Sequence, residues 1–275
     1  MTLPSNFSAV VTGAGSGLGR ALADEIASRG GRLVISDIHE ENLAETADKL
    51  RRQGAEVHSA VCDVSRVDEV RELAELAELH LGPIDLLCNN AGVAVGGGFE
   101  SISLEDWEWI VGINLWGVIY GCRAFLPAMR KRGSGHILNV ASAAGLLRAP
   151  NMTAYNVTKV GVVGLSETLY AEYKPHGVHV GVLCPTFFRT NIMENSRGEE
   201  DPKMKHLVGK WMDRSKVQAK EVAQSALRAM DERELYIVPM RDGRMMWRMK
   251  RAAPQRFHDF LVDGQTKIQK LFARR

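Results

Sequence analysis

The chain of 275 residues is 45% hydrophobic and carries 35 Lys and Arg against 33 Asp and Glu, a net charge of +2. This length and apolar content support a large buried core in one or two domains, and the balanced charge argues against nucleic acid as a partner. The four cysteines, Cys62, Cys88, Cys122 and Cys184, stand singly, which indicates buried apolar side chains and neither a zinc site nor a disulfide framework.

Short apolar runs alternate with longer amphipathic stretches along the chain. The runs predict strands at 9–11, 33–35, 60–62, 85–88, 136–141, 178–184 and 235–239. Apolar residues at helical spacing predict helices at 40–52 and 66–80, and a further helix from Tyr155 to about Tyr173. This alternation predicts an α/β fold, a Rossmann-type doubly wound parallel sheet of about seven strands with helices on both faces.

A glycine-rich turn, TGAGSGLG at residues 12–19, follows the first predicted strand and opens a helix. Glycines there let the backbone turn tightly and approach a pyrophosphate at the helix N-terminus. Asp37 ends the second strand, where a carboxylate can accept hydrogen bonds from both hydroxyls of an adenosine ribose and repel a 2′-phosphate. Neither Ser16 nor Ile38 is basic, so the sequence favours NAD over NADP. A solvated turn acid is the competing interpretation of Asp37.

Asp63 follows the third predicted strand. Its carboxylate is placed to contact an adenine ring. It is equally placed to cap the helix that starts near Arg66. The sequence alone does not choose between these two interpretations.

Tyr155 and Lys159 stand one helical turn apart, which puts both side chains on one face of a helix. A phenol ionises near about pH 10, and a nearby ammonium stabilises the phenolate, so the pair suits general acid/base chemistry. Ser142 lies at the carboxyl end of the fifth strand, the edge at which open α/β sheets bind ligands. Its hydroxyl can hold a substrate oxygen, and a strand-end cap is the competing interpretation.

The chain resembles a short-chain dehydrogenase/reductase from about Ser8 to Met193. The motifs that carry the resemblance are TGAGSGLG at 12–19, the acid Asp37, CDV at 62–64, NNAG at 89–92, Asn114 in a helix, Ser142, YNVTK at 155–159, and a segment from Pro185 to Thr190. The resemblance implies an enzyme that acts on CH–OH groups and transfers a hydride between NAD(H) and a secondary alcohol or ketone. It implies no metal site.

The resemblance also implies roles for the catalytic residues. Ser142 would polarise the substrate oxygen, Tyr155 would transfer the proton, and Lys159 would lower the pKa of Tyr155 and hold the nicotinamide ribose. Asn114 would anchor a water that relays protons from Lys159 to solvent. That role is compatible with a structural one, a polar bridge between helix and strand backbone.

The expected cofactor contacts come from the same comparison of motifs. Asn90, Ala91 and Gly92 would run beside the ribose, and Thr190 would fix the nicotinamide carboxamide. The full set is Gly13, Gly15, Ser16, Gly17, Leu18, Gly19, Asp37, Ile38, Asp63, Val64, Asn90, Ala91, Gly92, Tyr155, Lys159, Pro185, Phe188 and Thr190.

Two features depart from the family pattern. Thr186 stands after Pro185 where the family usually has Gly, a change expected to reshape the floor of the nicotinamide pocket. The chain also continues for more than thirty residues past the last predicted strand. We therefore predict one dinucleotide-binding and catalytic domain over residues 1–240 and a basic amphipathic helical extension over residues 241–275.

Residues 187–216 would form the substrate lid by their position in the family. They include the apolar residues Phe187, Phe188, Ile192, Met193, Met204, Leu207, Trp211 and Met212. Soft, bulky side chains over a pocket predict a bulky hydrophobic substrate, which would be steroid-like, aryl or long-chain. The core of two short helices is the competing interpretation.

The extension carries six basic residues between Arg241 and Arg256, with Met245, Met246, Trp247 and Met249 among them. Such a helix can lie on an anionic membrane surface, pack on a sister subunit or cover the substrate entrance. We favour packing or an entrance cover over peripheral membrane contact. The resemblance implies a homodimer or homotetramer formed through the helices that hold Asn114 and Tyr155.

The chain is expected to be soluble and cytoplasmic. Its first residues lack the basic stretch and apolar run of a signal peptide, and no stretch approaches the apolar length that crosses a bilayer. Two other functions stay open: a non-catalytic NAD(P)-sensing module and an epimerase or dehydratase on the same fold. A sensor need not retain all four catalytic residues, and the dehydrogenase interpretation needs the fewest assumptions.

Overall fold

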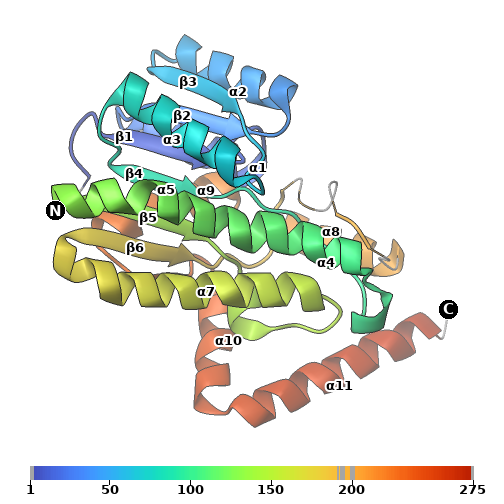
Figure 1. Cartoon of the computed structure of the whole chain (residues 1–275). Helices are drawn as coiled ribbons and strands as arrows, with labels where there is room; N and C mark the ends of the chain where they lie inside the picture. The colour runs from blue at the N-terminus through green and yellow to red at the C-terminus, as the bar shows by residue number, and fades with distance from the viewer. Residues whose placement is uncertain (1–2, 191, 193–195, 199–201, 274–275) are drawn as a thin grey trace.

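One parallel sheet forms the centre of the molecule (Figure 1). The computed structural model describes residues 3–190, 192, 196–198 and 202–273, and within them seven strands pair in the order β3-β2-β1-β4-β5-β6-β7. The strands are β1 (Ser8–Thr12), β2 (Arg32–Asp37), β3 (Val57–Val61), β4 (Leu86–Asn89), β5 (Gly135–Val140), β6 (Val178–Leu183) and β7 (Tyr236–Ile237). The predicted doubly wound sheet is confirmed, and its strand order reverses between β1 and β4, where such folds bind ligands.

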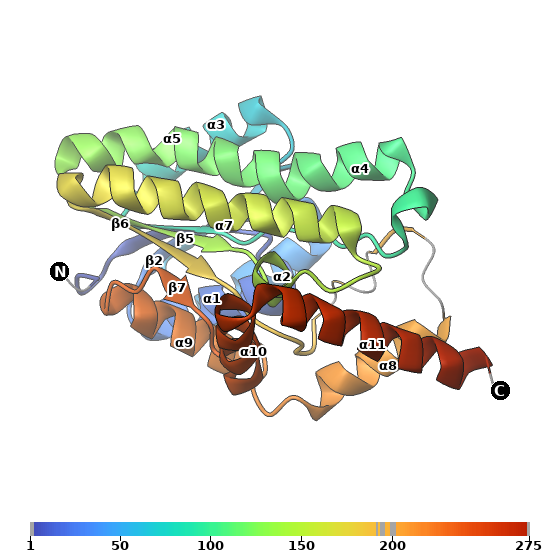
Figure 2. The ribbon, with the colours of Figure 1, turned by 90° about the horizontal axis from the view of Figure 1, so that it is seen from below.

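Helices cover both faces of the sheet (Figure 2). One face carries α3 (Val67–Leu81), α4 (Leu104–Val111), the π-helical turn Gly112–Trp116, α5 (Gly117–Arg132) and α7 (Thr153–Tyr173). The other carries α1 (Gly17–Ser28), α2 (Glu40–Arg52) and α9 (Ala219–Asp231). The remaining helices are α6 (Ala143–Leu147), α8 (Pro202–Arg214), α10 (Arg241–Ala252), α11 (Pro254–Ala273) and the 3-10 turns Phe99–Ser101 and Lys174–His176.

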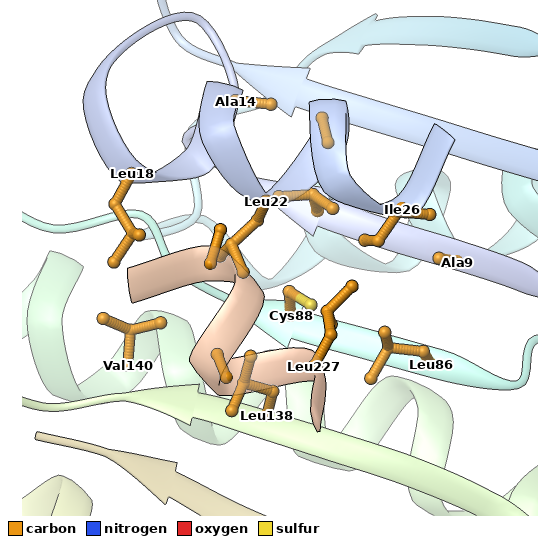
Figure 3. Packing of buried hydrophobic residues seen from close by; sticks show 14 of the residues in the cluster. Ala9, Ala14, Leu18, Leu22, Ile26, Leu86, Cys88, Leu138, Val140 and Leu227 are labelled. Carbon is orange, nitrogen blue, oxygen red and sulfur yellow. The ribbon is translucent and has the colours of Figure 1, made fainter. Parts of the chain in front are cut away.

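Alternate side chains of each strand supply the cores of the two layers, as the period of a strand requires. In β1, Ala9 and Val11 belong to the cluster that contains α1, α2 and α9, whereas Val10 belongs to the cluster of α3, α5 and α7. Figure 3 shows Leu227 of α9 lying between Ile26 of α1 and the strands. Burying one such side chain contributes about 2 kcal/mol.

The longest apolar helix corrects one expectation. The continuous helical stretch Leu104–Arg132 contains an 18-residue window with a mean hydropathy of 1.4, and by length and composition it could cross a bilayer. The prediction that no stretch approaches that length was therefore wrong. Part of its apolar surface packs in the core beside the sheet, where Val118, Cys122, Phe125 and Met129 are buried. Leu104 and Trp116 of the same stretch are exposed.

Two buried histidines pair across β5 and β6. His136 lies opposite His179 in the strand register, with ring centroids 6.0 Å apart. Burial lowers the pKa of His136, and burial together with His136 lowers the pKa of His179 to about 4. The folded protein therefore holds both rings neutral in a range where an unfolded chain, with a histidine pKa of about 6.5, takes up protons.

The free energy of unfolding should fall as the pH is lowered from about 6.5 towards 4, because only the unfolded chain gains protons on these rings in that range. For His179 the loss is at most about 3 kcal/mol. Urea denaturation gives the free energy of unfolding at pH 7.5 and at pH 5. The difference between the two values should be smaller for His179→Phe than for the wild type, and it should be the same for the exposed His39→Gln as for the wild type. An unchanged difference in His179→Phe would contradict this origin.

Candidate active site

The predicted site residues gather at the carboxyl ends of the central strands. Asp37 is the last residue of β2, and the glycine turn, Asn90, Ser142 and Pro185 follow β1, β4, β5 and β6. Tyr155 lies in the first turn of α7. Ala143 N donates to Pro185 O at 2.8 Å, which ties the loops after β5 and β6 together.

The glycine turn packs against the loop after β4. Gly13 adopts φ +66°, and a Cβ there would come 2.7 Å from the Cα of Ala91. Asn90 Nδ2 donates to Thr12 O at 2.8 Å, and Thr12 Oγ1 accepts from the amides of Asn90 and Ala91 at 3.1 Å. The structure therefore joins two predicted segments, and the glycine at position 13 is required by backbone conformation and close approach.

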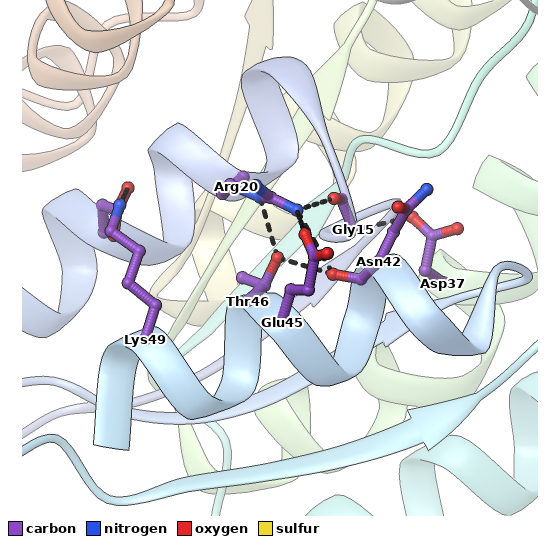
Figure 4. A network of polar contacts seen from close by, with 8 residues as sticks. Gly15, Arg20, Asp37, Asn42, Glu45, Thr46 and Lys49 are labelled. Atoms are coloured by element: carbon purple, nitrogen blue, oxygen red, sulfur yellow. Dashed lines mark hydrogen bonds and ion pairs between the residues drawn. The ribbon is translucent and has the colours of Figure 1, made fainter. Parts of the chain in front are cut away.

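Gly15 is held from both sides (Figure 4). Its amide donates to Asp37 Oδ2 at 2.8 Å, and its carbonyl accepts from Arg20 Nη2 at 2.6 Å. Arg20 also donates to Thr46 Oγ1 at 2.9 Å and lies 3.5 Å from Glu45. Arg20 is not among the predicted site residues, because its partners on α2 are distant in sequence.

Asp37 has a structural task besides the predicted one. Its Oδ1 accepts from the amide of His39 at 3.0 Å, so both carboxylate oxygens shape the turn. The carboxylate of Asp37 is half-buried and contacts the glycine turn, so the two features that the sequence analysis linked lie side by side. Ile38 beside it is 55% exposed and presents an apolar surface at the rim.

Asp63 stabilises the turn that precedes α3. Its Oδ1 accepts from the amide and the hydroxyl of Ser65, at 2.9 and 2.7 Å. The N-cap of α3 is Arg66, and no side chain caps this helix, so the prediction that Asp63 caps it is wrong. The adenine contact of Asp63 stays a prediction. Val64 is buried, and a Cβ on Gly117 would come 2.9 Å from its Cγ2, so its side chain faces the protein interior.

The segment after β6 is placed only in part. Phe188 is buried in the core cluster that includes α9, so a contact with cofactor has to come from its backbone. Thr190 Oγ1 accepts from the amide of Ile192 at 3.4 Å. Residues 191, 193–195 and 199–201 of the predicted lid, Met193 among them, lie outside the described residues, as do the side chains of Met204, Leu207 and Trp211.

Tyr155 and Ser142 form the chemical centre of the site. Ser142 begins α6, and its Oγ accepts from the amide of Ala144 at 3.1 Å. Tyr155 is only 8% exposed. Burial raises the pKa of Tyr155, and the neighbouring Ser142 side chain acts in the opposite direction and lowers it. The two hydroxyls therefore share one site, as predicted.

Lys159 lies on the same helical face as Tyr155, with Nζ 5.6 Å from the centroid of the Tyr155 ring. Nζ donates to Val140 O at 3.0 Å, and burial lowers the pKa of Lys159 to about 8. In the protein alone, burial outweighs the other influences on Tyr155, so the lowering of its pKa by Lys159 stays a prediction. An ammonium has three donors, which leaves donors for the hydroxyls of a ribose.

Asn114 bridges a helix and the loop after β4, where its structural interpretation predicted a bridge to strand backbone. Its Nδ2 donates to Val93 O at 2.9 Å and to Thr158 Oγ1 at 3.3 Å, and its Oδ1 accepts from Val93 N at 2.8 Å. The residue lies in the π-helical turn and is 0% exposed. Such turns are frequent at functional sites. Because the buried amide of Asn114 already makes these three hydrogen bonds within the protein, its role in a water relay stays a prediction.

These residues fit a nicotinamide dinucleotide. The glycine turn has no room for a Cβ at Gly13, which suits the close approach of a pyrophosphate. At Gly92 a Cβ would come 3.2 Å from Asn114 Oδ1 and 3.5 Å from Lys159 Nζ, so the loop after β4 runs directly beside the catalytic lysine.

The comparisons with known proteins agree with this geometry. Residues 8–201 match the model of the short chain dehydrogenase family. The chain belongs to the short-chain dehydrogenase/reductase family. Membership makes it an oxidoreductase of this family with NAD(P) as its cofactor.

Three similar proteins show the range of this family. A short-chain dehydrogenase/reductase from Burkholderia phymatum, solved in complex with NAD, is 38% identical with a TM-score of 0.87, covering 93% of this chain and 96% of that one. One from Sphingobium yanoikuyae, solved with NADPH, is 27% identical with a TM-score of 0.75, covering 92% and 95%. Estradiol 17-beta-dehydrogenase 11 of Pongo abelii is 36% identical over 189 residues, 68% of this chain and 63% of that protein.

Proposed function

We propose that the enzyme transfers a hydride between NAD(H) and a bulky hydrophobic secondary alcohol or ketone. The observation that carries the proposal is the buried Tyr155, which lies beside the Ser142 side chain and shares a helical face with Lys159. A buried phenol beside a hydroxyl and an ammonium suits proton transfer to and from an alcohol oxygen.

In the oxidative direction each residue has a defined task. Ser142 Oγ donates a hydrogen bond to the alcohol oxygen, and Tyr155 Oη takes the hydroxyl proton as the C–O bond becomes a carbonyl. The Lys159 ammonium stabilises the phenolate that receives this proton. NAD⁺, when bound, supplies the acceptor for the hydride that the carbinol carbon loses, so the products are a ketone, NADH and a proton.

Two features support NAD as the preferred cofactor. Asp37 places a carboxylate beside the glycine turn, where it would repel a 2′-phosphate. Arg20, which follows the glycine turn in α1, is engaged with Gly15, Thr46 and Glu45, so pairing with a phosphate would require it to give up these contacts. The similar Burkholderia structure holds NAD, whereas the less similar Sphingobium structure holds NADPH.

An apolar cluster around Tyr155 supports a hydrophobic substrate. Val95 and Ala154 are buried in this cluster, and Val93, Ala144 and Met152 pack against it half-buried. A bridge between Gly97 and Met152 joins the loop after β4 to the loop before α7. Uncharged walls suit an aryl, steroid-like or long-chain ketone better than a sugar or a hydroxy acid, and estradiol 17-beta-dehydrogenase 11 is named for a steroid alcohol.

Two exposed aromatic and apolar side chains support assembly of the enzyme with copies of itself. Trp116 at the start of α5 and Val157 on α7 are exposed, and Trp116 stacks on Tyr120. A homodimer or homotetramer formed through α5 and α7 would cover them.

The experiment for the proposed function is a substrate panel read by NADH absorbance. Aryl, cyclic and long-chain secondary alcohols are compared with polyols and hydroxy acids, each with NAD⁺ and with NADP⁺. The highest kcat/KM is expected for a bulky apolar alcohol with NAD⁺. Highest kcat/KM values for polyols or acids would overturn the substrate class, and a preference for NADP⁺ would overturn the cofactor assignment.

A further inference from the structure

Lys250 is a buried lysine in the C-terminal extension, far in sequence from the catalytic residues. It is 8% exposed, whereas Arg248 and Arg251 on the same helix are exposed. Its Nζ donates a hydrogen bond of 2.6 Å to the backbone carbonyl of Leu146. Burying an ammonium costs free energy unless it is well hydrogen-bonded. The hydrogen bond to Leu146 therefore helps to fix the position of α10 against the domain.

The acceptor belongs to the short helix that starts at the catalytic serine. Ser142 is the N-cap of α6, and Leu146 lies in its last turn. The last carbonyls of a helix have no partners within it, and a cation there is favourable. Arg148 ends α6 in the left-handed region at φ 62°, an uncommon conformation for a residue with a side chain. Lys250 thus supports the end of α6 opposite to Ser142.

α6 is also fixed on its other side, by the helix that carries Tyr155. A Cβ on Gly145 would come 2.6 Å from the carbonyl oxygen of Lys159, so α6 and α7 are in close backbone contact. α6 is therefore held between α7 and the extension. A change in its position would move Ser142 relative to Tyr155.

The start of α10 contacts the segment after β6. A Cβ on Gly243 would come 2.7 Å from Thr186 Cγ2, and Thr186 Oγ1 donates to Asp242 Oδ1 at 3.4 Å. Thr186 is the residue that departs from the family pattern. Because Gly243 has no side chain, there is room beside it for the methyl group of Thr186. The two departures noted in the sequence, Thr186 and the extension, are therefore one structural feature.

Further contacts hold the extension to its own domain. Trp247 of α10 packs on Tyr236 of β7, with ring centroids 4.8 Å apart. Phe257 of α11 is buried in the cluster that includes Leu147, and Gln265 Nε2 donates to Asn151 Oδ1 at 3.4 Å in the loop before α7. Figure 1 shows α10 descending from the domain and α11 running along its lower edge.

We propose that the C-terminal extension is a fixed wall of the active site of its own chain, and that Lys250 is a positioning residue that holds α6, and through it Ser142, in place. The proposal rests on the proposed function, because it concerns the serine that orients the alcohol oxygen. It assigns the tail to the site itself, in preference to a membrane or a sister subunit.

The test compares Lys250→Met with Arg248→Met, a matched control on the exposed side of the same helix. Hydrogen exchange followed by mass spectrometry reports on α6 without need of a substrate. In Lys250→Met, amides of residues 143–148 are expected to exchange about tenfold or more faster, whereas peptides from β1 and α1 stay unchanged. Arg248→Met should change neither. The affinity for NADH should stay within about twofold of the wild type, because the hydrogen bond of Lys250 goes to Leu146 of α6 and not to the glycine turn.

Turnover of the best alcohol in the panel gives the second readout. Lys250→Met should lower kcat about tenfold with little change in the KM for NAD⁺. In a Ser142→Ala background the same substitution should have almost no further effect on kcat, since it acts through Ser142. If Lys250 serves only the stability of the fold, its effect would be the same in both backgrounds.

A second variant changes the start of α10, so that the proposal can still be tested if Lys250→Met misfolds. Gly243→Ala should also speed exchange of residues 143–148, and adding Thr186→Ser, which removes only the Cγ2 methyl, should restore slow exchange. Unchanged exchange in α6, or faster exchange spread evenly over the whole chain, would overturn the proposal. If no alcohol is oxidised by the wild type, the proposed function fails while the exchange result still decides whether the wall exists.

Discussion

Replacing Tyr155 by Phe is expected to lower kcat on the order of 1,000-fold, because a positioned acid/base group contributes about 100- to 10,000-fold. The ring of Tyr155 is buried in an apolar cluster, which a phenylalanine ring also fills. Folding and NADH binding should therefore be preserved. Steady-state oxidation of an alcohol from the panel and NADH fluorescence titration measure the two properties.

A matched control lies on the same helix. Tyr173 ends α7 at the side of the molecule away from the site, and Tyr173→Phe should retain the wild-type kcat. If Tyr155→Phe kept more than about a tenth of the wild-type kcat, another group would have to move the proton.

Replacing Asp37 by Ala is expected to weaken NADH binding tenfold to a hundredfold while NADPH binding stays the same or improves. A hydrogen bond to a charged group contributes about 1.5–3 kcal/mol, and the acid also repels a 2′-phosphate. Fluorescence titration with both reduced cofactors gives the ratio of the two affinities. The exposed Asp48→Ala on α2 should leave this ratio unchanged.

Asp37 also accepts hydrogen bonds from the amides of Gly15 and His39, so its replacement removes structural bonds as well as charge. Asp37→Asn removes the charge and keeps one acceptor oxygen, so it retains one of the two structural hydrogen bonds that Asp37→Ala loses. Improved NADPH binding in Asp37→Asn would assign the preference to charge. Equal losses of both cofactors in both variants would show that Asp37 acts only by shaping the turn.

Much of the fold follows from local patterns. The prediction of a helix over residues 40–52 matches α2 because Leu43, Ala47 and Leu50 form one buried stripe. The third strand was predicted at 60–62 and lies at Val57–Val61, because it is an edge strand in which buried and exposed residues do not form an apolar run. No bounds were predicted for the helical stretch Leu104–Arg132, because the polar Asn114, which is buried in the structure, interrupts its apolar pattern.

The site residues were predictable where residues close in sequence determine the local geometry. The glycine turn and the pair of Tyr155 and Lys159 are defined by short spacings, and Asp37 is defined by its place at the end of β2. The structure places them as expected. Contacts between distant segments were not predictable. Lys250 and Leu146 are 104 positions apart, and their hydrogen bond depends on the path that the chain takes after β7. The basic pattern of α10 gave no sign that one of its cations is buried.

The most direct test of the enzyme's chemistry follows a hydrogen atom. The wild-type protein is incubated with NAD⁺ and the best alcohol of the panel, deuterated at its carbinol carbon, and the reduced cofactor is examined by mass spectrometry. Direct hydride transfer predicts that the deuterium is found in the nicotinamide ring of the NADH formed, in equal amount with the ketone. Ketone or isomerised alcohol formed without deuterated NADH would contradict the dehydrogenase mechanism.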